Sequence, residues 1–135
     1  MKKLLLVSTC AVLSLGFAAS ANAADCKAKD IKGSWVGKIS GDVENFCLIE
    51  FNGSAKISQA NCFLAEDLQS IGTLQGRMKL SKACEVSGSL SQVSPEGEKT
   101  EVAVSGQLDP KMGVLNGQFM VGDEALPFLL VRQWK

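Results

Sequence analysis

The chain has 135 residues with 14 basic and 14 acidic side chains, and it contains 5 cysteines but no histidine or tyrosine. Histidine is the commonest general base and metal ligand, so its absence argues against histidine-dependent catalysis and the usual zinc sites. The balanced charge argues against a nucleic-acid-binding protein, which normally carries a basic excess. The length is that of a single domain.

The first residues have the features of a secretory signal peptide. Lys2 and Lys3 precede an apolar run from Leu4 to Ala19, and residues 21–23, Ala-Asn-Ala, fit a cleavage site. We therefore expect residues 1–23 to be removed and residues 24–135 to form one mature domain. A transmembrane anchor is the alternative, but the apolar run is short for that and ends in small residues. The two-lysine start is typical of bacteria, so we expect a periplasmic or secreted protein without a membrane span in the mature chain.

Short runs of alternating apolar residues recur along the mature chain, separated by Gly, Asn, Asp and Pro. This alternation, without a sustained helical period, predicts an antiparallel all-β domain. Residues 61–70 fit a loop, one helical turn or an extra short strand. Asn52-Gly53 is a preferred two-residue hairpin turn. Eight strands are expected, at residues 33–40, 43–51, 54–60, 69–80, 84–93, 100–108, 114–121 and 125–134.

A five-residue pattern of apolar, polar, Gly, any and apolar residues occurs five times in the chain. In each copy the glycine shares the parity of the apolar residues, so it faces the same side of its strand. One explanation is that missing side chains let strands bend tightly around a small closed barrel. The other is that they leave interior room for a ligand. The copies are at residues 31–35, 74–78, 86–90, 104–108 and 115–119.

Eight short strands with short connections predict an up-and-down meander. Closing it into a barrel removes the exposed edges, and an open sandwich of the same strands is the alternative. Strand parity then sorts the connections into two ends. The top receives the turns near 41–42, 61–70, 94–99 and 122–124. The bottom receives the start of the domain, the turns near 52–53, 81–83 and 109–113, and the C-terminus.

The cysteines of the mature chain are even in number, which in an oxidising compartment predicts two disulfides, with four free buried thiols as the alternative. Cys26 and Cys84 both fall at the bottom. Cys62 begins the long top loop and can fold back towards Cys47 in the neighbouring strand. The expected pairs are therefore Cys26–Cys84 and Cys47–Cys62.

Gly33-Ser34-Trp35 in the first expected strand, together with Arg132 in the last, resembles the calycin arrangement shared by lipocalins, avidin and the small bacterial metalloproteinase inhibitors. In those proteins the Trp sits near the closed end of the barrel and the Arg packs across it. The resemblance implies the same contact between Trp35 and Arg132, and the alternative is that Arg132 is a surface charge. The size, the signal peptide and Cys47 soon after the Trp are most similar to the periplasmic inhibitors.

Sorting the connections also separates the charges. At or near the top there are nine acidic residues and two basic ones, which gives a net charge of −7. The bottom has ten basic residues and five acidic ones. Such a field steers a cationic partner towards the top. Chance segregation in polar turns is the alternative, and an extra strand in 61–70 would remove the pattern. The top residues are Asp42, Glu44, Glu66, Asp67, Glu96, Glu98, Glu101, Asp123 and Glu124, with Lys38 and Lys99.

The candidate binding site consists of top-loop residues. Phe63 and Leu64 either anchor a partner or turn inward to plug the barrel. Neither Glu66-Asp67 nor the pair Glu96 and Glu98 has the spacing of a calcium loop, so no metal or cofactor is predicted. The full set is Asp42, Glu44, Phe63, Leu64, Glu66, Asp67, Glu96, Glu98, Asp123 and Glu124.

We therefore expect a non-catalytic binding protein, an inhibitor-like module for a hydrolase or another cationic protein. The alternative is a lipocalin-like carrier of a small apolar ligand in the barrel interior. A deep apolar cavity open at the top would favour the carrier, and a filled barrel would favour the protein binder. An enzyme would need a buried carboxylate pair.

Overall fold

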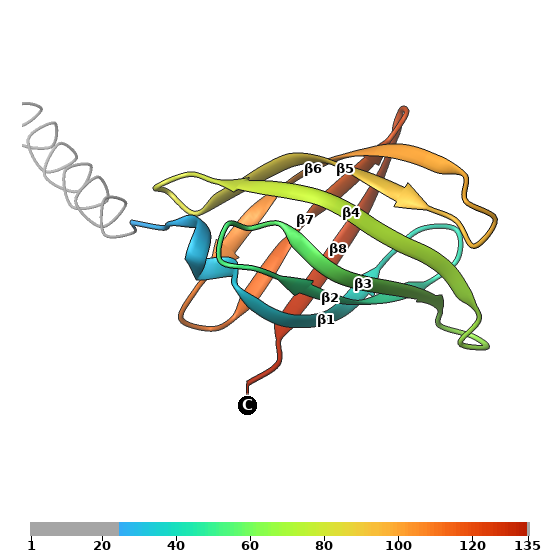
Figure 1. The fold of residues 1–135 in the computed structure, drawn as a ribbon, viewed down its shortest axis with the longest axis horizontal. Coiled ribbons are helices and arrows are strands. Elements are labelled where there is room, and N and C mark those ends of the chain that lie inside the picture. Colours follow the sequence, from blue (N-terminus) through green and yellow to red (C-terminus); the bar gives the residue numbers. More distant parts are fainter. Residues whose placement is uncertain (1–24, 135) are drawn as a thin grey trace, which may run out of the picture.

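The structure, a computed structural model, describes residues 25–134, so the expected signal peptide lies outside the described residues. A short 3₁₀ helix, η1 (Ala28–Ile31), precedes eight strands (Figure 1). Among residues 25–134 there is no helix with the length and apolarity needed to cross a membrane. The strands are β1 (Gly33–Ile39), β2 (Asn45–Phe51), β3 (Ile57–Leu64), β4 (Ser70–Leu80), β5 (Glu85–Val93), β6 (Lys99–Asp109), β7 (Val114–Val121) and β8 (Glu124–Arg132).

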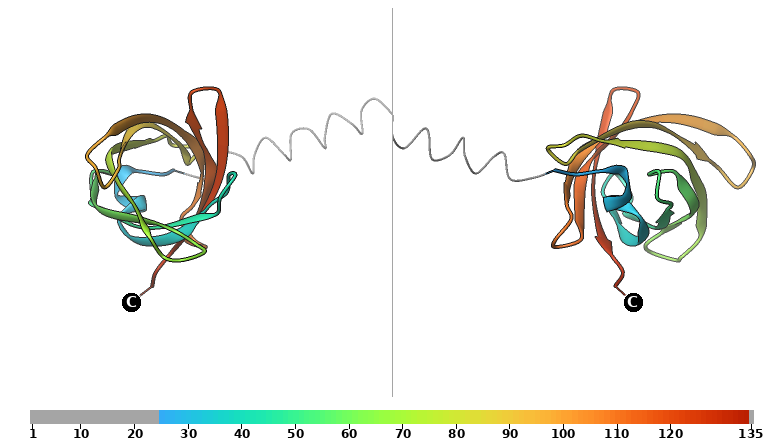
Figure 2. Two further views of the ribbon diagram at one scale, coloured as in Figure 1. Left: turned by 90° about the vertical axis from the view of Figure 1, so that its right-hand side faces the viewer. Right: turned by 60° about the vertical axis from the view of Figure 1, so that its left-hand side comes forward.

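The eight strands form a closed antiparallel barrel. Each strand pairs with the next in sequence, and β8 returns to pair with β1. Viewed from one end, the strands enclose a ring (Figure 2, left). The expected all-β meander and its closure are confirmed, and the open sandwich is excluded.

Antiparallel order places alternate connections at opposite ends of the barrel. We use "top end" for the connections 40–44, 65–69, 94–98 and 122–123, at the right in Figure 1. The "bottom end" comprises the connections 52–56, 81–84 and 110–113 with the flanking segments 25–32 and 133–134. The strand number matches the expected one, so the two ends hold the connections assigned to them from the sequence.

The third strand differs from its expected position, residues 54–60. The Asn52 side-chain oxygen accepts hydrogen bonds from the backbone N–H groups of Ser54 and Lys56, each at 3.0 Å. These bonds hold residues 52–56 in a turn wider than a two-residue hairpin, so β3 begins at Ile57. It then continues through residues 61–64, and only residues 65–69 form a loop. The last strand ends at Arg132 and not at residue 134.

Apolar side chains fill the barrel interior. Trp35, Leu115 and Leu130 are completely buried, and Phe119 stacks on Phe128 with ring centroids 4.5 Å apart. None of the polar or charged residues in 25–134 is buried. The interior is therefore a packed core built from the inward parity of all eight strands.

Four of the five repeated glycines, all but Gly33, lie against the backbone of a neighbouring strand. Gly106 and Gly117 are direct partners in the β6–β7 register. A Cβ atom added to Gly117 would lie 2.6 Å from the Cα of Gly106 and would overlap the carbonyl oxygen of Ser105. Because the space beside these glycines is occupied by neighbouring backbone, they permit tight bending of the sheet and do not create ligand volume.

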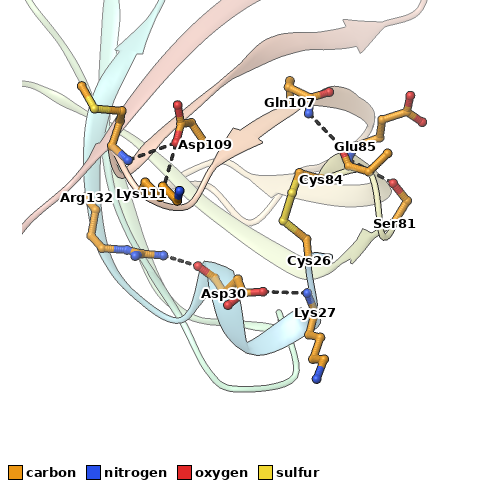
Figure 3. Close-up of a disulfide and its surroundings, with 12 residues drawn as sticks. Cys26, Lys27, Asp30, Ser81, Cys84, Glu85, Gln107, Asp109, Lys111 and Arg132 are labelled. Atoms are coloured by element: carbon orange, nitrogen blue, oxygen red, sulfur yellow. Dashed lines mark hydrogen bonds between the residues drawn. A yellow bond between two sulfur atoms is a disulfide. The ribbon is translucent and has the colours of Figure 1, made fainter. Parts of the chain in front are cut away.

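Both expected disulfides are present. Cys26–Cys84 ties the start of the domain to the β4–β5 turn (Figure 3). The backbone N–H of Cys26 also donates to the carbonyl of Lys82 at 3.0 Å. Cys47–Cys62 joins directly opposed residues of β2 and β3. Cys62 thus lies within a strand and not at the start of a loop. Paired cysteines are typical of proteins from oxidising compartments.

Candidate functional site

The bottom of the barrel interior is closed by η1 and the first strand. Trp35 donates its indole N–H to the carbonyl of Ile31 at 2.8 Å, and both side chains are completely buried. The guanidinium carbon of Arg132 lies 4.7 Å from the centroid of the Trp35 ring, and Arg132 also donates to the carbonyl of Asp30 (Figure 3). The Trp–Arg contact expected from the sequence is present. The buried side chains of Ile31 and Trp35 therefore fill the interior at this end.

The top of the interior contains a small apolar cavity of about 50 Å³. Asn45 is one of the residues that line this cavity, and its side-chain oxygen is buried and has no hydrogen-bond partner within residues 25–134. A volume of this size holds a few water molecules, whereas pockets for drug-sized ligands occupy roughly 300–1,000 Å³. The lining residues are Ile39, Asn45, Cys62, Ile71, Leu74, Gln92, Val102, Phe119, Val121 and Leu126.

Two top-end connections come together around a shallow acidic hollow. The hollow is lined by Asp42, Val43 and Glu44 from the β1–β2 connection and by Ala65 and Glu66 from the β3–β4 connection. The backbone N–H of Ala65 donates to the carbonyl of Glu44 at 3.0 Å, which holds the two connections side by side. Glu44 also pairs with Lys38 at 2.7 Å. The structure therefore unites Asp42, Glu44 and Glu66 in one surface.

The other candidate carboxylates lie on separate parts of the top end. Glu96 and Glu98 belong to the β5–β6 connection, whereas Asp123 and Glu124 lie at the β7–β8 turn. Apart from Lys38–Glu44, the described part of the chain contains no ion pair, so these exposed charges are uncompensated by direct contacts. Glu101 differs from them because it lies on β6, where it accepts a hydrogen bond from Ser91 at 2.8 Å.

Phe63 and Leu64 do not form an exposed pair in a loop. Both are half-buried residues of β3. The ring of Phe63 packs against Phe46 of β2 with centroids 5.4 Å apart, so it neither projects as an anchor nor plugs the barrel. Leu64 is the register partner of Asn45 at the top rim. The expectation failed because β3 extends four residues beyond its predicted end.

The exposed apolar residues of the top end are Val43 and Leu68. Their exposed fractions are 50% and 63%, and each follows acidic residues in a connection. Sequence reasoning did not select them. The available signal was a single large apolar residue beside carboxylates, in Asp42-Val43-Glu44 and in Glu66-Asp67-Leu68.

The remaining chemistry of this site is that of a charged surface. Within residues 25–134, no three or more Asp, Glu or Cys side chains are grouped closely enough to hold a metal ion. No protein-family model matches the chain, and no curated protein matches it in sequence.

Proposed function

We propose that this protein is a periplasmic or secreted binding protein that docks on a cationic protein, a secreted hydrolase that it inhibits, through the top end of its barrel. The observation that carries the proposal is the acidic hollow between the β1–β2 and β3–β4 connections. Its lining combines the carboxylates of Asp42, Glu44 and Glu66 with the exposed Val43, and the exposed Leu68 belongs to the same β3–β4 connection as Glu66. An apolar centre with a charged rim is the usual anatomy of a protein interface.

The charge distribution supports a cationic partner. The top end and the strand ends next to it carry nine acidic and two basic residues, and one carboxylate, that of Glu44, is paired in the described part of the chain. Opposite charges on the two sides of an interface increase the association rate. The excess of acidic residues at the top end also repels acidic proteins. The overall composition is balanced, so this preference exists because the fold gathers the acidic residues at one end.

The inhibitor role is supported by resemblance and by compartment. The Gly33-Ser34-Trp35 segment and Arg132 resemble the calycin arrangement found in small periplasmic metalloproteinase inhibitors. Trp35 and Arg132, the residues that pack together in that arrangement, are in contact here. A signal peptide with two disulfides fits export to the periplasm or beyond.

The carrier alternative has less support. The cavity at the top of the interior holds about 50 Å³, and the glycines that could have opened it contact neighbouring backbone. A lipocalin-like role predicts saturable binding of an apolar fluorescent probe such as 1-anilinonaphthalene-8-sulfonate to the folded protein. We expect no saturable binding, and one-to-one binding would favour the carrier.

The binding proposal is tested with purified cationic secreted hydrolases, with lysozyme as the first probe. We expect salt-sensitive binding in biolayer interferometry and reduced hydrolase activity for at least one of them. Succinylated lysozyme, in which lysine charges are reversed, is the matched control and should not bind. Absence of binding across a broad panel would refute the proposal, and binding without reduced activity would refute the inhibitor role alone.

Charge-reversal variants locate the site. Glu66→Lys combined with Asp67→Lys should weaken binding at least about ten-fold, because it replaces attraction by repulsion at the hollow. Glu50→Lys combined with Glu85→Lys is the matched control, since both residues are exposed but lie towards the bottom end. Equal loss of affinity in the two double variants would contradict a top-end site. Leu68→Ser tests the apolar contribution in the same assay.

A further inference from the structure

The bottom end of the barrel is a cationic surface. Together with the strand ends next to it, it carries nine basic and five acidic side chains, a net charge of +4 within the described residues. Eight of the nine cations are exposed, and none of them forms an ion pair within residues 25–134. Figure 3 shows Lys27 and Lys111 at this end. The basic residues are Lys27, Lys29, Lys32, Lys56, Arg77, Lys79, Lys82, Lys111 and the half-buried Arg132. The acidic ones are Asp25, Asp30, Glu50, Glu85 and Asp109.

Two large apolar side chains project from the same end. Met112 and Trp134 have exposed fractions of 68% and 65%, higher than those of the other exposed large apolar residues in 25–134. They lie beside one turn, because a Cβ atom added to Gly113 would come within 2.8 Å of the Trp134 ring. The Arg132 guanidinium also lies 5.2 Å from the centroid of that ring.

The turn that carries Met112 is held in place by its own hydrogen bonds. The Asp109 side chain accepts from the backbone N–H groups of Lys111 and Met112, both at 3.1 Å, and the N–H of Gly113 donates to the Asp109 carbonyl at 2.9 Å. Lys111 and Met112 are therefore presented side by side at the tip of a constrained turn. Val131, exposed by 43% and paired with Val114, extends the apolar surface along the outside of the barrel.

We propose that the bottom end docks on an anionic lipid surface. A bilayer of this kind offers phosphate charges above an apolar layer, which matches exposed lysines surrounding a projecting Trp and Met. Trp is favoured at the boundary between headgroups and acyl chains because its ring is apolar and its N–H is polar. An acidic protein is the competing partner for such a surface, and binding to protein-free anionic vesicles distinguishes the two.

Docking in this way orients the molecule. The acidic top end lies opposite the bottom end, so repulsion from anionic headgroups reinforces the attraction of the lysines. The top connections then point away from the membrane and remain accessible. This inference is independent of the proposed binding of a cationic protein, because it involves the other end of the barrel and a different class of partner.

The test is co-sedimentation of the exported, purified protein with vesicles. We expect binding to equal parts of phosphatidylglycerol and phosphatidylcholine, and little binding to phosphatidylcholine alone. The binding should weaken on raising the salt from about 0.15 M to 1 M, as the Debye length falls from about 8 Å to 3 Å. Failure to bind the anionic vesicles, or equal binding to both, would overturn the proposal.

Variants identify the surface responsible. Each lysine near the membrane strengthens partition by about five-fold, so Lys29→Gln, Lys32→Gln and Lys111→Gln together should reduce it by about 100-fold. Lys38→Gln with Lys99→Gln is the matched top-end control and should change it less than two-fold. A comparable loss in the control would overturn the assignment to the bottom end.

The apolar tips are tested separately. Met112→Ser should reduce partition several-fold, and tryptophan emission should shift to the blue on vesicle binding, because Trp134 is exposed whereas Trp35 is already buried. Near-ultraviolet circular dichroism checks that each variant is folded. Lysine-dependent binding to heparin without binding to vesicles would instead indicate a soluble polyanion and would overturn the lipid proposal.

Discussion

Arg132 and Trp35 are direct register partners where the last strand of the barrel meets the first. The guanidinium carbon of Arg132 lies 4.7 Å from the centroid of the buried Trp35 ring. The same side chain donates to the carbonyl of Asp30 within η1. One residue therefore fastens β8 to β1 and to the helical turn that closes the bottom of the interior.

Replacing Arg132 by Met should destabilise the barrel. Methionine keeps an apolar stem over Trp35 but removes the charge and the hydrogen bond to Asp30. Together these losses should lower the free energy of unfolding by about 2 kcal/mol, measured by urea titration. Arg77→Met, at an exposed position on β4, is the control and should change it by less than about 0.5 kcal/mol. Equal effects of the two substitutions would contradict the fastening role.

Trp35→Ala should be among the most damaging single substitutions. The ring is completely buried, and its N–H satisfies the carbonyl of Ile31. Deleting a buried large aromatic side chain costs about 3–5 kcal/mol through lost transfer energy and the cavity left behind. The denaturant midpoint monitored by far-ultraviolet circular dichroism measures this loss. A cost well under about 1 kcal/mol would show that Trp35 is not a core anchor.

The two disulfides should contribute unequally to stability. Cys26–Cys84 spans 58 residues and Cys47–Cys62 spans 15. Closing the longer loop restricts the unfolded chain more, which corresponds to about 4 kcal/mol against about 3 kcal/mol in the chain-entropy model. We therefore expect Cys26→Ala with Cys84→Ala to lower the thermal midpoint further than Cys47→Ala with Cys62→Ala. The reverse order would mean that native contacts, and not loop closure, dominate.

Gly117→Ala should strain the sheet. The added methyl would meet the carbonyl of Ser105 and the backbone of Gly106 on the neighbouring strand. Overpacking against backbone should cost at least about 2 kcal/mol in the free energy of unfolding. Gly53→Ala is the matched control, because no atom lies within 4 Å of its added Cβ, and it should have little effect. A neutral Gly117→Ala would imply that β6 and β7 can separate at little cost.

The sequence by itself determined the fold class, the number of strands and both disulfide pairs. Alternation of apolar residues is a local signal, and an unbroken meander converts strand parity into position at one end or the other. For this reason the sequence alone predicts the pairs Cys26–Cys84 and Cys47–Cys62 that the structure contains. The separation of acidic and basic residues followed from the same parity.

Tertiary structure decided what the barrel interior and the top surface contain. Whether the repeated glycines open a cavity or admit a neighbouring strand depends on distances between strands, and here Gly117 meets the backbone of β6. Residues 61–64 are part of β3 because they pair with β2, although their local sequence also fits a loop or a helical turn. This pairing places the ring of Phe63 against that of Phe46. Exposure of Val43, Leu68, Met112 and Trp134 likewise depends on which residues come to cover them, and local sequence does not specify those neighbours.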